Sequence, residues 1–411
     1  MKRFVVSVAI FFVVFIIYFA VGTQYTFKPK WAIDHFNPMA SSLLKGQFNI
    51  ESPAETHDLI YFSGKWYMPW GILPALFLIP PQMILGRFIP IFYMSVFFAG
   101  LNVSLFYLLL ERIKKEFLPE FSYKSIFFVT ILFAFGTTHF YVGTLGSTWH
   151  VSQMVASFFA TLGIFAIFKK KRSFSNYFFS SVFFSITLLC RPSTAFLLTL
   201  PLLLFLFDFL KRKKMNAQEL SKGIILICLP FVLCLLWYFF YNYIRFGNIL
   251  QTGYDYIKES PNLETIREAN GVNSIKNIPQ NFWYMFFEVP RITFSQHTFH
   301  FDFNLYGNSI LFLTPPFLTA FLAFPFKKEG GKLKLNFYIL SLWVTSIIAL
   351  LPILMHYSSG WMQFGYRYTL DVTVLLLLLS IFGIKGKVNV LYVGGILLAL
   401  IFHIIGIQAL M

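Results

Sequence analysis

The chain has 411 residues, of which 57% are hydrophobic and 20% aromatic, while only 12% are charged. Its mean hydropathy is +0.68 and its formal net charge is +16. This composition leaves little room for a soluble domain and indicates a polytopic membrane protein. The basic residues form short clusters between apolar runs, so we assign the positive charge to membrane topology and exclude nucleic acid as a partner.

Eleven apolar runs have the length of roughly 20 residues that a bilayer-spanning helix needs. The first resembles an uncleaved signal anchor, because no small-residue cleavage site follows it. We therefore predict an all-α integral membrane fold with about 11 transmembrane helices in one domain over residues 1–411. The predicted spans are 4–22, 91–110, 125–141, 149–168, 174–190, 193–210, 222–241, 308–325, 335–355, 367–384 and 388–409.

Residues 71–88 are apolar enough for a twelfth span, but Pro74, Pro80 and Pro81 interrupt them, and interior prolines bend a helix. With eleven spans, one side of the membrane receives 21 basic and 6 acidic residues, and the other receives 12 basic and 11 acidic. The positive-inside rule assigns the first side to the cytoplasm. We therefore predict an interfacial or re-entrant helix at 71–88 and a cytoplasmic N-terminus.

Two long polar segments, 23–90 and 242–307, fall on the opposite side and are predicted to be extracytoplasmic loops with juxtamembrane helices. Long structured loops in a compact protein are usually functional, so the active site is expected there. Neither segment contains an Asn-x-Ser/Thr glycosylation signal, which suits a bacterial plasma (inner) membrane.

Two carboxylates in the first loop are candidates for chemistry. Asp34 precedes an amphipathic stretch at 40–46, where it is either a helix cap or a catalytic base. Asp58 opens a predicted hairpin at 57–74 that contains a Ser-Gly-Lys turn. In that hairpin Asp58, Lys65 and Tyr67 are either ordinary solvated residues or line a cavity at headgroup depth.

Basic residues on the same side are candidates for binding an anion. Arg191 ends a span and either snorkels to headgroups or faces a cavity. Arg367 begins the tenth span and either pairs with Asp371 one turn later or contacts a phosphate. Arg245 is either an interfacial anchor or a phosphate ligand, and Lys65 is the fourth candidate.

Histidine and tryptophan side chains supply further candidates. His139, His150, His297 and His300 do not define a zinc site, which needs three or four ligands at constrained distances, so no metal site is predicted. His150 is either an interfacial anchor or a hydrogen-bonding group for sugar or phosphate. Trp66 belongs to an aromatic belt or stacks on a sugar ring.

Several motifs in chain order resemble the GT-C superfamily of polytopic glycosyltransferases, which includes protein O-mannosyltransferases and lipid A aminoarabinose transferases. The acidic pair that often follows the family's first span is Asp34-His35 here, and the frequent Pro-Pro is Trp70-Gly71. The matching features are Asp34 with the helix at 40–46, the segment GKWY followed by LPALFLIP, LLCRPST at 188–194, YNYIRFGNILQTGYDY at 241–256, and QFGYRYTLDV at 363–372.

The resemblance implies transfer of a sugar from a polyprenyl-phosphate donor to an acceptor hydroxyl on the extracytoplasmic face, with inversion. Asp34 is then the base and Asp58 the second choice. The donor phosphate is assigned to Arg191, Arg367, Lys65 and Arg245, and the substrate lining to His35, Tyr67, His150 and Trp66. The acceptor is a lipid, glycan or protein, and no cofactor is expected, with a divalent metal as the less favoured alternative.

Two rival functions remain open. A transporter or flippase of a lipid-linked sugar typically shows inverted repeats and charges at mid-membrane, whereas this chain has no detectable repeat and carries its charges at span ends. A membrane scaffold needs none of the charged residues in the two loops.

Overall fold

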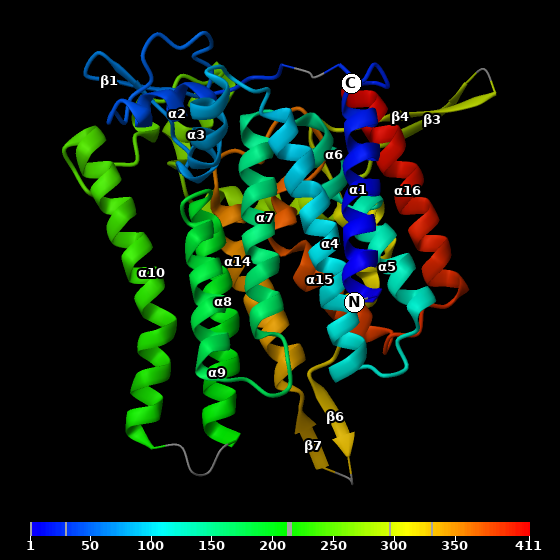
Figure 1. Cartoon of the computed structure of the whole chain (residues 1–411). Coiled ribbons are helices and arrows are strands. Elements are labelled where there is room, and N and C mark those ends of the chain that lie inside the picture. Colours follow the sequence, from blue (N-terminus) through cyan, green and yellow to red (C-terminus); the bar gives the residue numbers. More distant parts are fainter. Residues whose placement is uncertain (1, 29–30, 212–215, 296, 330–331) are drawn as a thin grey trace.

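Long apolar helices run side by side through most of the chain (Figure 1). The computed structural model describes residues 2–28, 31–211, 216–295, 297–329 and 332–411. Seven helical segments in these ranges are long and apolar enough to cross a membrane, and a pair bent by 47° makes an eighth. They are α1 (Lys2–Gly22), α4 (Phe92–Glu116), the bent pair α5 (Tyr123–Phe135) and α6 (Thr138–Leu145), α7 (Thr148–Ile167), the 3₁₀ helix η1 (Pro192–Leu198) continuing into α9 (Thr199–Lys211), α10 (Ala217–Phe246), α14 (Phe337–Met355) and α16 (Val390–Leu410).

The all-α membrane fold is confirmed, whereas the count of eleven spans is not. Three predicted spans contain shorter helices, and a 14-residue α-helix is only about 21 Å long against a hydrocarbon core of about 30 Å. Prolines limit two of them, because proline lacks the N–H that a helix interior needs. The shorter helices are α8 (Phe174–Thr187), followed by Pro192; α13 (Ile310–Leu313) and η4 (Pro315–Leu322), separated at Pro315; and α15 (Leu370–Gly383).

The two long polar segments lie at the same end of the bundle, at the top of Figure 1, which we call the loop end. The helix predicted within 71–88 is present as α3 and is shorter than a membrane span. The first segment contains α2 (Phe36–Leu44), the antiparallel strands β1 (Ile60–Phe62) and β2 (Lys65–Tyr67), and α3 (Leu73–Leu85). The second contains η2 (Tyr254–Tyr256), α11 (Pro261–Asn270), η3 (Ile275–Asn277), α12 (Ile278–Phe286), and strands β3 (Arg291–Ser295), β4 (Thr298–Asp302) and β5 (Tyr306–Asn308).

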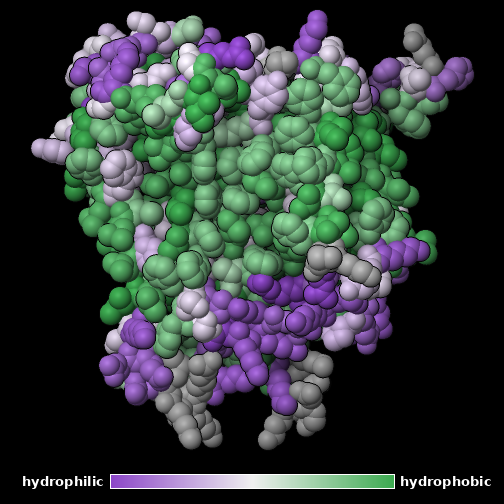
Figure 2. Space-filling model, viewed as in Figure 1, coloured by the Kyte–Doolittle hydropathy of each residue, from purple (hydrophilic) through white to green (hydrophobic). Residues whose placement is uncertain are grey.

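The opposite end, which we call the basic end, carries the turn after α7 and the hairpin of β6 (Phe326–Glu329) and β7 (Lys332–Leu335). On the face seen in Figure 2, a hydrophobic belt crosses the bundle and is bounded below by a hydrophilic band at this end. The first helix starts near that band, and the C-terminus lies at the loop end. Charge and chain path therefore divide the molecule into two chemically different ends.

The break between α5 and α6 shows how the bundle provides hydrogen-bond partners for backbone groups that lose their helical ones. Inside a bilayer every backbone polar group needs a partner within the protein. The Tyr18 hydroxyl donates to the carbonyl of Ala134, and Thr314 Oγ1 donates to the carbonyl of Gly136 at 2.8 Å. Tyr18 approaches because Gly143 has no side chain, since a Cβ there would lie 2.5 Å from the tyrosine ring. Side chains of α1 and the α13–η4 turn thus replace the missing helical bonds.

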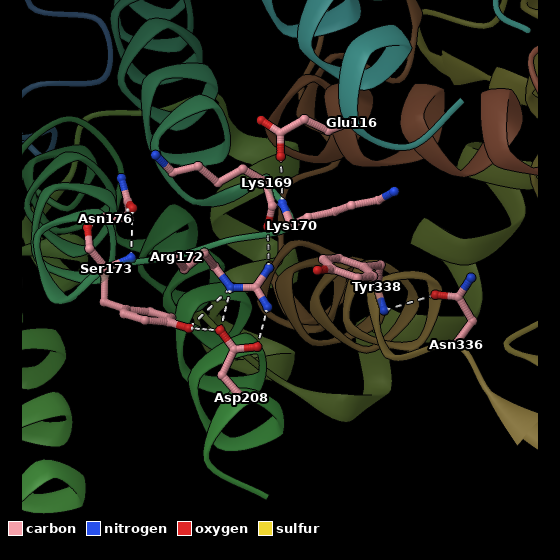
Figure 3. Close-up of polar contacts among 10 residues, drawn as sticks. Glu116, Lys169, Lys170, Arg172, Ser173, Asn176, Asp208, Asn336 and Tyr338 are labelled. Carbon is pink, nitrogen blue, oxygen red and sulfur yellow. Dashed lines mark hydrogen bonds and ion pairs between the residues drawn. The ribbon is translucent and has the colours of Figure 1, made fainter. Parts of the chain in front are cut away.

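A buried ion pair fixes the basic end (Figure 3). Arg172, in the turn between α7 and α8, donates from Nε and Nη2 to the two carboxylate oxygens of Asp208 at 3.0 and 2.6 Å. Tyr177 Oη donates to the same carboxylate at 2.5 Å, and Arg172 Nη1 donates to the Lys169 carbonyl at 2.7 Å. The guanidinium carbon also lies 5.1 Å from the Tyr338 ring centroid. We call Arg172, Tyr177 and Asp208 the inner arginine cluster. It joins α8 to α9, and its contact with Tyr338 adds α14.

Candidate active site at the loop end

Asp34 is held at the start of α2 by hydrogen bonds. Its Oδ1 accepts from the backbone N–H groups of Phe36 and Asn37 at 2.9 and 3.0 Å, and its Oδ2 accepts from Asn37 Nδ2. Burial raises the pKa of Asp34, and the hydrogen bonds from Asn37 and Phe36 oppose that rise. Gln82 of α3 donates to Asn37 Oδ1 at 2.8 Å. The carboxylate therefore caps α2, uses both oxygens in doing so, and helps to join α2 to α3.

His35 fastens the first loop to the start of α7. Its backbone N–H donates to Thr148 Oγ1 at 3.0 Å, and its Nε2 lies 3.1 Å from the His57 carbonyl oxygen. The imidazole stacks on Trp70, with ring centroids 5.8 Å apart. Burial is the main cause that lowers the pKa of His35 to about 4. The ring is therefore neutral near pH 7 and serves as a buried contact between the loop and α7.

Asp58 lies where both loops and α7 meet. Its backbone has φ of +60° and donates to the Lys258 carbonyl at 2.7 Å, which ties the first loop to the second. Its Oδ2 accepts from Trp149 Nε1 at 3.0 Å, and its Oδ1 lies 3.7 Å from His57 Nε2. Burial raises the pKa of Asp58, and the charges of His57 and Arg367 and the Trp149 hydrogen bond oppose the rise. Asp58 therefore keeps acceptor capacity that Asp34 has already used.

Two arginines, a tyrosine and an aspartate form a second group, which we call the outer arginine cluster: Arg191, Arg367, Tyr368 and Asp371. Arg191 directly precedes η1, and Arg367 opens the 3₁₀ helix η5 (Arg367–Thr369). Both guanidinium carbons lie near the Tyr368 ring, at 4.9 and 5.3 Å from its centroid. Geometries of this kind allow attraction between each cation and the ring.

The carboxylate of this cluster pairs across the bundle. Asp371 Oδ2 lies 3.4 Å from Arg191 Nε and accepts from Ser193 Oγ at 3.3 Å. The sequence offered a pairing of Asp371 with Arg367 along one helix face. Arg367 lies instead in the 3₁₀ turn before α15, and the ion pair that the structure places on Asp371 comes from Arg191. One carboxylate thus serves a site that contains two arginines.

The first turns of α7 connect Asp58 to the outer arginine cluster. Trp149 donates to Asp58, and Gln153, one helical turn later, donates from Nε2 to the Arg367 carbonyl at 3.3 Å. Ser152 Oγ donates to the carbonyl of Cys190, the neighbour of Arg191, at 3.2 Å. Residues one turn apart share a helix face, so α7 sets the spacing between the carboxylate and the two arginines.

Several buried polar atoms at this site lack a hydrogen-bond partner among the described residues. They are Nε of Arg367, Nε2 of His150 and Oε1 of Gln153; Nε of Arg191 also forms no hydrogen bond there and has only its 3.4 Å ion-pair contact with Asp371. The other ring nitrogen of His150, Nδ1, is 2.5 Å from Ser147 Oγ. Buried polar atoms in native proteins almost always have partners, and a buried cation without one is costly. The arginine N–H groups at this site are donors, a chemistry that suits anionic oxygens.

Residues of the second loop and of the turn after α14 form another polar network at the loop end. Arg267 Nε lies 2.7 Å from Glu259 Oε1, and Tyr357 Oη donates to Glu259 Oε2 at 2.5 Å. Burial is the main cause that lowers the pKa of His356 to about 4; the hydrogen bond with the Ser358 carbonyl opposes this shift, and the charges of Arg191 and Arg367 contribute to it. A pocket of about 330 Å³ opens between the loops; it is lined by Glu55, Thr56, His57, Ile257, Lys258, Glu259 and Glu264.

Sequence reasoning missed Tyr368, His356 and Glu259. Tyr368 lies inside the QFGYRYTLDV motif, between Arg367 and Asp371, so its place beside two arginines had a local signal. Glu259 and His356 had none: Glu259 and Tyr357 are separated by 98 residues, and His356 forms an isolated β-bridge with Asn273 of the second loop.

The remaining predicted residues lie away from the outer arginine cluster or are already bonded. Lys65 is exposed on β2, and Trp66 is half-buried with its ring 4.7 Å from that of Tyr61. Tyr67 is buried in a small apolar group with Ile60, Phe246 and Ile257. Arg245 donates to the carbonyls of Met68 and Tyr241 and to Asn242 Oδ1 at 2.6, 3.2 and 2.8 Å, so its guanidinium holds the hairpin against α10.

The four histidines considered as metal ligands occupy different surroundings. His297 and His300 lie in an exposed hairpin, while His139 and His150 are buried in the bundle. Within the part of the chain that the structure describes, no three His, Cys, Asp or Glu side chains come together in a way that suits a metal ion.

Comparison with known proteins gives one structural match. No protein-family model and no curated protein sequence matches the chain. The chain is similar to ArnT from Cupriavidus metallidurans, whose crystal structure is bound to undecaprenyl phosphate. Sequence identity is 11% and the TM-score is 0.43, and the match covers 93% of this chain and 59% of that one.

Proposed function

We propose that this protein is a membrane glycosyltransferase that moves a sugar from a polyprenyl-phosphate donor to an acceptor hydroxyl at the loop end. The observation that carries the proposal is the outer arginine cluster: Arg191 meets Asp371 through one 3.4 Å contact, and the Nε of buried Arg367 has no hydrogen-bond partner among the described residues. Arginine suits a phosphate because its planar fork matches two phosphate oxygens. Two cations and one carboxylate leave one net positive charge for that phosphate.

The reaction requires a base and stabilisation of the leaving group. The acceptor oxygen attacks the anomeric carbon, the bond from that carbon to the phosphate oxygen breaks, and the acceptor proton passes to a carboxylate. The lipid phosphate leaves with the bonding electron pair, and Arg191 and Arg367 stabilise its negative charge. A single displacement of this kind inverts the anomeric centre.

Asp58 is the base that the geometry favours. A general base works best when its pKa lies nearer the working pH, and burial raises the pKa of Asp58. Asp34, the first choice from sequence, also has a raised pKa, but it accepts three hydrogen bonds in capping α2. We assign Asp34 to positioning the first loop. His35 and Trp149 hold that loop, and with it Asp58, against the start of α7. Tyr368 takes the same role for the two guanidinium groups.

The first test is donor consumption by the purified protein in lipid nanodiscs. Undecaprenyl-phosphate-linked sugars serve as probes, because undecaprenyl phosphate is the lipid bound in the ArnT structure. We expect release of free undecaprenyl phosphate together with a glycosylated acceptor, both measured by mass spectrometry. Donor that crosses the bilayer without cleavage would establish the flippase alternative instead.

A matched pair of variants separates the two carboxylates. Asp58→Asn should lower turnover by about 10²–10⁴-fold, the usual contribution of a general base. Asp34→Asn should lower it only a few-fold, because asparagine caps a helix nearly as well as aspartate. The opposite ranking would transfer the base role to Asp34, and unchanged turnover in both variants would remove carboxylate catalysis altogether.

We place the protein, by the same proposal, in a bacterial plasma membrane with its loop end extracytoplasmic. The basic end then faces the cytoplasm, as the positive-inside rule requires. Membrane-impermeant labelling of a cysteine at exposed Lys65 in intact cells checks this sidedness. Protection of that cysteine until the cells are lysed would place the site in the cytoplasm and exclude an extracytoplasmic transferase.

A further inference from the structure

The hairpin of β3 and β4 extends outward from the bundle at the loop end (Figure 1). Its strands are antiparallel, and its register pairs Ile292 with Phe301 and Phe294 with Phe299. Residues that face each other across a strand pair lie on the same side of the sheet, and successive residues alternate sides. These four side chains therefore form one continuous face.

That face is entirely apolar, and the opposite face is entirely polar. The polar face holds the remaining three pairs, Arg291 with Asp302, Thr293 with His300, and Ser295 with Thr298. No cross-strand pair combines an apolar with a polar side chain. This pattern is expected where one side of a sheet meets hydrocarbon and the other meets water or headgroups.

Most of the apolar face is uncovered by the protein. Phe294 and Phe299 are 64% and 68% exposed, Ile292 is 47% exposed, and the two phenylalanine rings contact each other at 4.9 Å between centroids. Soluble surfaces rarely leave a cluster of this kind in water. The face therefore needs a partner with apolar chemistry.

The apolar face continues into the lipid-facing surface of the bundle. The ring of Phe301 lies 6.1 Å from that of Phe402 on α16, between centroids. Helix α16 also exposes Leu397, Leu398, Ile401 and Ile404. Figure 2 shows hydrophobic atoms on the underside of the projecting hairpin, toward the hydrophobic belt, and hydrophilic atoms above them.

We propose that the β3–β4 hairpin lies in the headgroup region of the adjacent leaflet, with Ile292, Phe294 and Phe299 inserted among the acyl chains. The partner is lipid, because the apolar face is level and continuous with a helix surface that already meets hydrocarbon. The polar face, with Arg291, His300 and Asp302, remains at the height of the headgroups and water. The hairpin would extend the lipid contact of the second loop beyond the helix bundle.

The test places single cysteines on neighbouring positions of opposite faces. Phe294→Cys and Phe299→Cys report the apolar face, and Thr293→Cys and His300→Cys are their matched controls. The background carries Cys228→Ala and Cys234→Ala, and buried Cys190 is retained as the measure of background labelling. Each variant is labelled with an environment-sensitive fluorophore in nanodiscs and quenched either by nitroxide-labelled lipid or by aqueous iodide.

We expect lipid nitroxide to quench the labels at 294 and 299 several-fold more strongly than those at 293 and 300, with the reverse order for iodide. Equal quenching of all four labels by iodide would place the hairpin in water and overturn the proposal. Protection of 294 and 299 from both quenchers would also overturn it, since a protein surface would then cover the face. The labels report depth and not turnover, so the result is independent of the proposed transferase activity.

Discussion

The two arginine clusters use the same types of side chain at opposite ends of the bundle. They differ in how many of their hydrogen bonds and ion pairs are formed. In the inner arginine cluster, Arg172 forms a two-point contact with Asp208, and Tyr177 donates to the same carboxylate. In the outer arginine cluster, Arg191 Nε meets Asp371 through a single 3.4 Å contact, and Arg367 Nε has no hydrogen-bond partner in the part of the chain that the structure describes. The complete bonds of the inner cluster suit a role in stability, whereas the incomplete bonds of the outer cluster motivate the proposal that it binds a phosphate.

The largest effect expected from this comparison is on stability at the basic end. Arg172→Met leaves Asp208 buried without its main partner and should lower the free energy of unfolding by about 3–5 kcal/mol. Turnover per folded molecule should be unchanged, because the cluster lies at the end opposite the site. Chemical unfolding in detergent, read by tryptophan fluorescence, measures the first quantity. A decrease in the free energy of unfolding of less than about 1 kcal/mol is typical of exposed ion pairs. It would show that the inner cluster does not stabilise the fold more than an exposed ion pair does.

Arg367→Gln should show the reverse pattern at the loop end. Loss of a preorganised donor to the leaving phosphate should reduce turnover by about 10²–10³-fold. The unfolding midpoint should change less than in Arg172→Met, since Arg367 would lose its contact with the Tyr368 ring but no ion pair that the structure places on it. Arg245→Gln is the matched control at the same end: its bonds to the hairpin are complete, so it should lose stability before turnover. Equal turnover losses in both variants would show that an arginine with complete hydrogen bonds and one without them contribute alike to catalysis.

Acidification should weaken the loop end through His35. Its pKa in the folded protein is about 4, below the ordinary 6.5, so the unfolded chain binds more protons between these values. Stability should therefore fall as the pH drops from about 6.5 to 4, by on the order of 3 kcal/mol for a fully expressed shift. Melting temperatures of wild type and His35→Gln across that range measure the effect. A flatter dependence of melting temperature on pH in the variant would support the assignment to His35. A dependence parallel to that of the wild type would contradict it.

The smallest expected effect concerns the ring between the two outer arginines. Tyr368→Leu removes the aromatic face and should weaken donor binding by roughly 0.5–2 kcal/mol, a few-fold to about 30-fold in Kd. Tyr368→Phe keeps the ring and should weaken binding less. Titration with undecaprenyl phosphate, followed by thermal stabilisation, provides the measurement. Similar affinities for the leucine and phenylalanine variants would show that the ring does not hold the guanidinium groups.

The sequence predicted the features that depend on local pattern. Apolar runs located the long helices, prolines marked the short helix within 71–88, and the Ser-Gly-Lys turn placed the hairpin of β1 and β2. It failed where length is set by packing: α8 and α15 lie in apolar runs as long as the others, yet each has only 14 helical residues. A hydropathy pattern records apolar length and does not record where the backbone leaves the helix.

At the candidate site, sequence identified individual residues better than their partners. Asp58, Arg191 and Arg367 were all selected, but the connection of Asp58 to Trp149 spans 91 residues and that of Arg191 to Asp371 spans 180. Contacts across such separations depend on how the helices stack, for which a single sequence has no periodic signal. The structure pairs Asp371 with Arg191, and Arg367 lies in the 3₁₀ turn before α15, so the local spacing of Arg367 and Asp371 did not indicate this partner.

The short length of α8 has a consequence for the membrane around it. Its 14 residues cover about 21 Å, and Phe179 is exposed on its surface, so the bilayer beside it has to thin or the flanking chain has to reach the headgroups. Thinning at this flank would lower the headgroup plane toward Arg191, four residues past the end of α8. A carrier phosphate would then reach its arginines without being drawn into hydrocarbon. Acyl-chain length would thus act as a control on catalysis, with short-chain lipids favouring turnover over long-chain ones.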